Sequence, residues 1–233
     1  MISDDFGTLH LPMTPGDEGA VTLLWSDYPV NVIAILISAV LILLILRNYI
    51  SLFPTLTACL FRPNPNISLE HNFHTARERS NFAWAMLLPF AILVDRFNLY
   101  KPSFLGKIPP EWSLVSVFGV IAAFVAVRFL LFPLRPVRLH GDESKAAHLN
   151  LFTNFSVLVP TMILSFGIMH VLHAQEPTIR TVLLLETGLF YFLSIILTGR
   201  ILARQCSALP TFLYLCALEI IPAALIIASV LMF

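Results

Sequence analysis

Long apolar runs recur along this chain and alternate with short polar segments. A run of about twenty apolar residues, folded as an α-helix, crosses the roughly 30 Å hydrocarbon layer of a bilayer. The runs predict six transmembrane helices, at residues 29–49, 82–100, 112–132, 149–172, 181–202 and 210–233. The pattern therefore predicts an all-α fold, a polytopic membrane bundle of helices.

The segments between these runs are of different kinds. Residues 50–61 are apolar but too short to cross a membrane, and Pro54 interrupts them, so they predict either an interfacial helix or a bent continuation of the first helix. Residues 64–81 predict a polar loop, and residues 134–147 predict a hydrophilic linker. The polar loop carries a charge cluster that is expected to be solvated, at Arg77, Glu78 and Arg79.

Composition agrees with the membrane interpretation. The chain is 58% hydrophobic and 12% charged, about half the charged fraction of an average soluble domain. The formal net charge is zero, so no basic surface suggests nucleic acid as a partner. Residues 1–27 form an acidic segment without Lys or Arg, unlike the basic start of a signal peptide, and residues 28–233 form the six-span domain.

The basic residues predict an orientation in the membrane. With residues 1–27 outside, ten Lys and Arg residues fall on the cytoplasmic side and four on the outer side. This bias follows the positive-inside rule and predicts that both the N-terminus and the C-terminus are extracytoplasmic. Trp25, Trp84 and Trp112 fall near predicted helix ends, as in an interfacial aromatic belt.

The most informative single residue is Glu219, nine residues after Pro210 in the last apolar run and therefore about 13 Å deep. A carboxylate near the bilayer centre costs about 3 kcal/mol on insertion scales. Pro222, three residues later, removes a backbone N–H and bends the helix. Glu219 either binds a proton, a cation or a ligand, or bonds to a hydroxyl on a neighbouring helix. The expected hydroxyl partners are Thr161, Ser165, Tyr191 and Ser194.

Three further charged residues fall in the outer layer of the predicted bundle. Asp95 and Arg96 are adjacent near the end of the second run, so they point about 100° apart and are expected to meet different neighbours. Glu186 lies about a turn and a half into the fifth run, in the same layer. An Arg96–Glu186 ion pair is one hypothesis, and contact of both side chains with headgroups and water is the other.

His170 and His173 end the fourth run at a spacing of three residues, which places both on one helix face. Together they are candidate ligands for a metal or haem, and interfacial histidines without a ligand role are the alternative. The sequence contains no nucleophile–base set, phosphate-binding glycine loop or zinc-protease helix. It therefore favours a non-enzymatic protein, and no other residue pattern indicates a cofactor.

Residues 212–222 read Phe-Leu-Tyr-Leu-Cys-Ala-Leu-Glu-Ile-Ile-Pro and include Tyr214, Glu219 and Pro222. This stretch resembles the closing signature of a Bacteroidota integral-membrane family, domain of unknown function 4271, which has a similar size and span count. The resemblance implies a bacterial inner-membrane protein and links Glu219 to Pro222, and it implies no activity. The family usually continues into a short basic tail, whereas this sequence ends at Phe233.

These observations favour a non-enzymatic, multi-pass subunit of an envelope machine, for protein export or cell-envelope assembly, that docks partner membrane helices. Its expected partners are the lipid bilayer and other membrane subunits or further copies of itself, not nucleic acid. One alternative is a small proton- or cation-coupled transporter that uses Glu219. The other is a membrane haem or metal protein that uses His170 and His173.

Overall fold

A computed structural model describes residues 25–61, 72–100, 102, 108–131 and 141–203, together with positions 212, 215, 216, 220, 221, 223, 224 and 228. In the continuously described segments every regular element is helical, which confirms the all-α class. The long helices are α1 (Pro29–Phe61), α3 (Phe73–Arg96), α4 (Ser113–Leu131), α5 (Gly141–Val171) and α6 (Glu176–Leu202). Two 3₁₀ turns, η1 (Trp25–Asp27) and η3 (Pro110–Trp112), precede α1 and α4.

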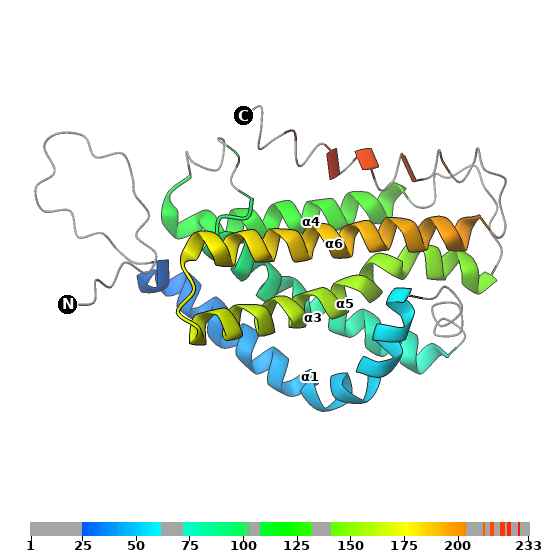
Figure 1. The fold of residues 1–233 in the computed structure, drawn as a ribbon, viewed down its shortest axis with the longest axis horizontal. Coiled ribbons are helices and arrows are strands. Elements are labelled where there is room, and N and C mark those ends of the chain that lie inside the picture. The colour runs from blue at the N-terminus through cyan, green and yellow to red at the C-terminus, as the bar shows by residue number, and fades with distance from the viewer. Residues whose placement is uncertain are drawn as a thin grey trace, which may run out of the picture.

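Successive helices run in opposite directions and lie along one another (Figure 1). α5 contacts α6, α3 and α1, and α3 also contacts α1 and α4. The antiparallel order gives the bundle two ends. We call the end where α1, α4 and α6 begin the Trp25 end, and the opposite end, where α3 and α5 begin, the Arg79 end.

Four of the described helices are long and apolar enough to cross a membrane, namely α1, α4, α5 and α6, which indicates a membrane protein. α3 is not among them, because it carries Arg77, Glu78 and Arg79 near its start and Asp95 and Arg96 at its end. The sixth predicted span, residues 210–233, lies outside the continuously described segments. The predicted count of six is therefore not confirmed.

Three helices begin earlier than hydropathy predicted, and the shift is smallest for α6, which begins at Glu176 rather than residue 181. α3 begins at Phe73 rather than residue 82, and α5 begins at Gly141 rather than residue 149, so much of the predicted loop 64–81 and linker 134–147 is helical. Hydropathy marks where a segment becomes apolar, whereas a helix begins where its first N–H groups find acceptors.

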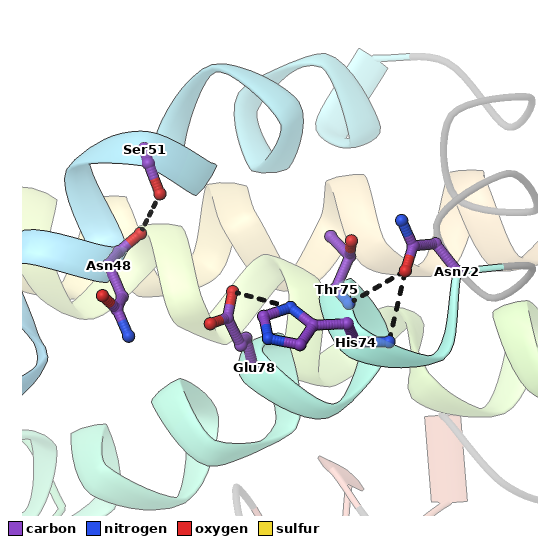
Figure 2. Close-up of polar contacts among 6 residues, drawn as sticks. All are labelled: Asn48, Ser51, Asn72, His74, Thr75 and Glu78. Carbon is purple, nitrogen blue, oxygen red and sulfur yellow. Dashed lines mark hydrogen bonds and ion pairs between the residues drawn. The ribbon is translucent and has the colours of Figure 1, made fainter.

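The start of α3 shows such a cap (Figure 2). The Asn72 side-chain oxygen accepts hydrogen bonds from the backbone N–H groups of His74, at 3.2 Å, and Thr75, at 3.4 Å. One turn on, His74 Nδ1 lies 3.7 Å from Glu78 Oε2, in the i, i+4 relation that supports a helix. These local bonds start the helix before its apolar part.

Residues 50–61 continue α1 rather than forming a separate interfacial helix, and α1 bends in its second half (Figure 1). Pro54 lies in this half and lacks the N–H that would bond to the residue 50 carbonyl. The Thr57 hydroxyl donates to the carbonyls of Phe53 and Pro54, each at 3.0 Å. The bent half packs Leu52, Leu56, Cys59 and Leu60 into a buried cluster with Tyr49, Phe82 and Val157.

Burial differs strongly between the helices. In α5, 44% of the apolar 18-residue stretch that could cross a membrane is buried inside the structure. In α1 the corresponding share is 11%. The first half of α1 buries a narrow stripe of Asn31, Ala34 and Ser38. Its other faces expose large apolar side chains such as Leu43 and Leu44, as expected of a surface that faces hydrocarbon. α5 is the core helix and α1 lies at the periphery.

Candidate functional site: polar residues buried in the bundle

Glu219, Pro222 and Tyr214, the principal candidates from the sequence, lie outside the described residues. Three of the expected hydroxyl partners of Glu219 have other bonds. Ser165 donates to Glu186, Ser194 accepts from Asn150, and Thr161 donates to the Leu158 carbonyl at 2.7 Å. The role of Glu219 stays a prediction.

One close approach involves α6 and the last part of the chain. A Cβ atom added at Gly199 would lie 3.2 Å from the Leu215 side chain. That distance is tighter than ordinary van der Waals contact, so glycine lets Leu215 lie close to the helix backbone. Position 199 therefore suits a residue without a side chain.

Asp95 anchors the Trp25 end of the bundle. Its carboxylate accepts a hydrogen bond from the Trp25 indole N–H at 2.7 Å and one from the Ser113 hydroxyl at 2.5 Å. Asp95 is 7% exposed, and hydrogen bonds to a carboxylate are stronger than those between neutral groups. The three residues come from α3, η1 and the start of α4, so one side chain fastens three elements.

Trp25 also contacts Arg96 and Asn31. The Arg96 guanidinium lies 5.5 Å from the centre of the indole ring, in a cation–π arrangement. The Asn31 side-chain amide donates to the Trp25 carbonyl at 2.8 Å. Asp95 and Arg96 thus meet the same residue, contrary to the prediction, because the broad indole presents its N–H edge to one and its face to the other.

Glu186 takes a different partner from the one proposed. The Ser165 hydroxyl on α5 donates to Glu186 Oε1, while Glu186 Oε2 is buried and has no hydrogen-bond partner among the described residues. With Arg96 held at the Trp25 ring, the hypothesised Arg96–Glu186 ion pair is not formed. Glu186 is half-buried, and its carboxyl is bonded on one oxygen while the other oxygen is buried.

The two candidate histidine ligands lie at the end of α5. The helix ends at Val171, so His173 follows in a turn with φ 54°, outside the helical spacing that the sequence predicted. The His170 ring stacks on Phe166, with 5.8 Å between the ring centres. Within the described residues no group of three or more His, Cys, Asp or Glu side chains could hold a metal ion. A ligand role for the pair stays a prediction.

A buried amide network joins α5 to α6, and the hydropathy and charge patterns of the sequence did not predict it. The Asn150 amide donates to the Ser194 carbonyl at 2.9 Å and to the Thr198 hydroxyl at 3.0 Å, and the Ser194 hydroxyl lies 3.4 Å from it. The Asn154 amide in turn donates to the Asn150 side-chain oxygen at 3.1 Å. All four side chains are at most 2% exposed. Asn150/Asn154 and Ser194/Thr198, each at i, i+4, are the signal that could have revealed it.

Near the Arg79 end, two arginines are buried. Arg79, expected to be solvated, is 1% exposed, so that prediction is wrong. Its position on α3 points into the bundle, because the helix extends beyond the apolar run and packs there on α1 and α5. Arg128 on α4 lies 3.4 Å from the His148 carbonyl of α5, to which it donates. Arg128 thus joins α4 to α5, whereas the Arg79 guanidinium lies 3.4 Å from the Ser80 hydroxyl of its own helix.

Replacing Asn150 with Leu is expected to lower the free energy of unfolding by about 1 kcal/mol, the scale of hydrogen bonds between membrane helices. Leu has as many side-chain heavy atoms as Asn and the same branching at Cγ, and it removes the bonds to Ser194 and Thr198. Unfolding in mixed micelles, titrated with a denaturing detergent, measures the change. The control is Asn48→Leu at an exposed position of α1, and equal effects of the two substitutions would contradict a structural role for the network.

These polar groups mostly fasten helices to one another, and Glu186 is the one acidic side chain among the described residues with a buried, unbonded oxygen. Comparison of the chain with known protein families, with curated proteins and with solved structures finds no match.

Proposed function

We propose that this protein is a non-enzymatic, multi-pass subunit of an envelope machine in a bacterial inner membrane, which docks partner membrane helices. The observation that supports this most is the outer surface of α1. Only 11% of its apolar 18-residue stretch is buried inside the structure. In the first half of the helix the buried residues form a narrow stripe of Asn31, Ala34 and Ser38. A long helix held on one side leaves most of its surface for other helices.

The internal bonds suit such a role. Asp95 fastens η1, α3 and α4 at the Trp25 end, and Asn150 fastens α5 to α6. A bundle locked in this way presents its outer faces in a fixed arrangement, and pre-formed surfaces bind partners at a lower entropic cost. Rigid packing therefore supports a scaffold role.

The proposed orientation places the Arg79 end in the cytoplasm. Among the arginines at the helix ends, Arg77, Arg79, Arg128 and Arg200 lie toward this end, whereas Arg96 and Arg180 lie toward the Trp25 end. By the positive-inside rule the basic end faces the cytoplasm. The N-terminal segment then faces the extracytoplasmic side, as the sequence predicts.

Photo-cross-linking in native membranes tests the subunit role. A photoreactive amino acid at Leu44 on the outer face of α1, which is 73% exposed, is expected to give a discrete protein adduct of defined mass. The matched control is the same residue at Leu185 of α6, which is 68% exposed and is expected to yield lipid adducts. Lipid adducts alone at Leu44 would contradict the proposal, and an adduct of twice the chain mass would identify the partner as a second copy.

A second candidate function is a small proton- or cation-coupled transporter. The observation that favours it is the half-buried Glu186, whose carboxyl oxygen Oε2 is buried and unbonded among the described residues, since ionisable groups inside membranes mark ion pathways. Glu219 keeps the role that the sequence predicts for it in this alternative. No contact in the described residues favours the haem or metal alternative with His170 and His173.

A further inference from the structure

The Glu186 carboxyl lies deeper in the bundle than the sequence predicted. α6 begins at Glu176, ten residues before Glu186, which corresponds to about 15 Å along the helix. Its partner Ser165 lies six residues before the end of α5 at Val171, or about 9 Å. Both helices are apolar enough to cross a membrane, so the pair lies within the hydrocarbon layer rather than at its surface.

The hydrogen bonds of this carboxyl are incomplete. Ser165 donates to Oε1, and Oε2 is buried without a hydrogen-bond partner among the described residues. The neighbouring Thr187 cannot complete the set, because its hydroxyl donates to the Leu183 carbonyl at 2.8 Å and lies 3.8 Å from Met162 Sδ. A buried carboxylate oxygen requires a donor or a positive charge.

The charged groups on the surrounding helices do not supply that charge. α5 and α1 contact α6, Leu93 of α3 shares a buried cluster with Ile179 and Leu183 of α6, and the described part shows no ion pair to Glu186. On α3, Asp95 and Arg96 contact Trp25 at the Trp25 end. The other titratable side chains of α3 lie toward the Arg79 end, at His74, Arg77, Glu78 and Arg79. Arg180 is six residues before Glu186 on α6, and His170 is five residues after Ser165 on α5, so both lie toward the Trp25 end. The remaining described titratable side chains of α1, α5 and α6 are Arg47, Tyr49, Cys59, His148, Glu176, Tyr191 and Arg200.

We propose that Glu186 and Ser165 form a binding site for a small monovalent cation, either a sodium ion or a proton. A carboxylate oxygen beside a hydroxyl oxygen is the ligand chemistry that hard cations prefer. The bound charge neutralises the carboxylate inside the membrane and satisfies Oε2. This site is independent of the proposed subunit role and is fully contained in α5 and α6.

Labelling with dicyclohexylcarbodiimide, an apolar reagent that adds to carboxyl groups, tests the site on the purified protein in proteoliposomes. Peptide mass spectrometry is expected to find the acylurea adduct at Glu186. If sodium is the ligand, sodium at about ten times its dissociation constant leaves roughly a tenth of the sites free and slows labelling about tenfold relative to choline at equal ionic strength. If the proton is the ligand, sodium has no effect and labelling falls steeply as the pH rises.

Two variants and one internal control make the result specific. Glu186→Gln should remove the adduct, and Ser165→Ala should keep it but weaken the protection by sodium, or shift the pH at which labelling falls. Glu176, an exposed carboxyl at the start of the same helix, should show no sodium protection. Absence of label at Glu186, or labelling there that ignores both sodium and pH, would overturn the proposal, and neither result bears on cross-linking at α1.

Discussion

Replacing Asp95 with Ala is expected to lower the free energy of unfolding by about 3 kcal/mol, because hydrogen bonds to a charged group contribute about 1.5–3 kcal/mol each. The substitution removes the acceptor for both the Trp25 indole N–H and the Ser113 hydroxyl. The indole N–H then loses its partner at a site where Asp95 is buried. Equilibrium unfolding in mixed micelles measures the loss.

The isosteric variant separates charge from geometry. In Asp95→Asn the side-chain oxygen can still accept from Trp25 and the amide can donate to Ser113, so the expected loss is only about 1 kcal/mol. Trp25→Phe removes one of the two bonds and should fall between the two Asp95 variants. Trp112→Phe, at a residue that is 55% exposed, should change stability by less than about 0.5 kcal/mol. An Asp95→Ala loss no larger than this control would rule out the anchoring role.

Run length was sufficient to predict the helical class, because the transfer of apolar side chains into hydrocarbon depends on composition over about twenty residues. It did not predict where α3 and α5 begin. The Asn72 cap and the His74–Glu78 pair start α3 in a polar segment, and such local bonds are independent of hydropathy. Extending the helix to Phe73 also explains why Arg79 is buried rather than solvated.

Charged residues were identifiable from the sequence because they are rare in membrane helices, and Asp95, Arg96 and Glu186 were among them. Their partners were not, since Trp25 is 70 residues from Asp95 and Ser165 is 21 residues from Glu186. The partners of amide and hydroxyl side chains are harder still to predict from the sequence. Thr57 and Thr181 bond to their own helix, whereas Asn150 bonds across 44 and 48 residues. The side-chain type alone does not distinguish these cases.

A proline inside a helix leaves a backbone carbonyl without its usual donor, and in this bundle a side chain of another helix can bond to that carbonyl. Pro160 lies inside α5 and has no N–H, so the Ser156 carbonyl four residues earlier has no helical donor. The Tyr49 hydroxyl of α1 donates to that carbonyl at 3.1 Å, inside the bundle. The ring is held edge-on by Phe82, with 5.7 Å between the ring centres. Tyr49 thus supplies from another helix the hydrogen bond that Pro160 removes.

Tyr49→Phe is therefore expected to lower the free energy of unfolding by about 1.5 kcal/mol, since it keeps the ring and leaves a buried carbonyl without a donor. In a Pro160→Ala background the N–H of residue 160 can bond to the Ser156 carbonyl, and the same substitution should cost about 0.5 kcal/mol or less. The expected coupling of about 1 kcal/mol is measured by a double-mutant cycle of unfolding in mixed micelles.

Pro89 provides the matched control for this cycle. It also lies inside a helix, α3, and is buried. The carbonyl that it leaves without a helical donor is that of residue 85, whereas the Tyr49 hydroxyl donates to the Ser156 carbonyl. Tyr49→Phe and Pro89→Ala should therefore be additive within about 0.5 kcal/mol. Equal coupling to both prolines would mean that Tyr49 responds to general loosening of the bundle. Coupling to Pro160 alone would show that the Tyr49 hydroxyl stabilises α5 at the Ser156 carbonyl, where Pro160 removes the helical hydrogen bond.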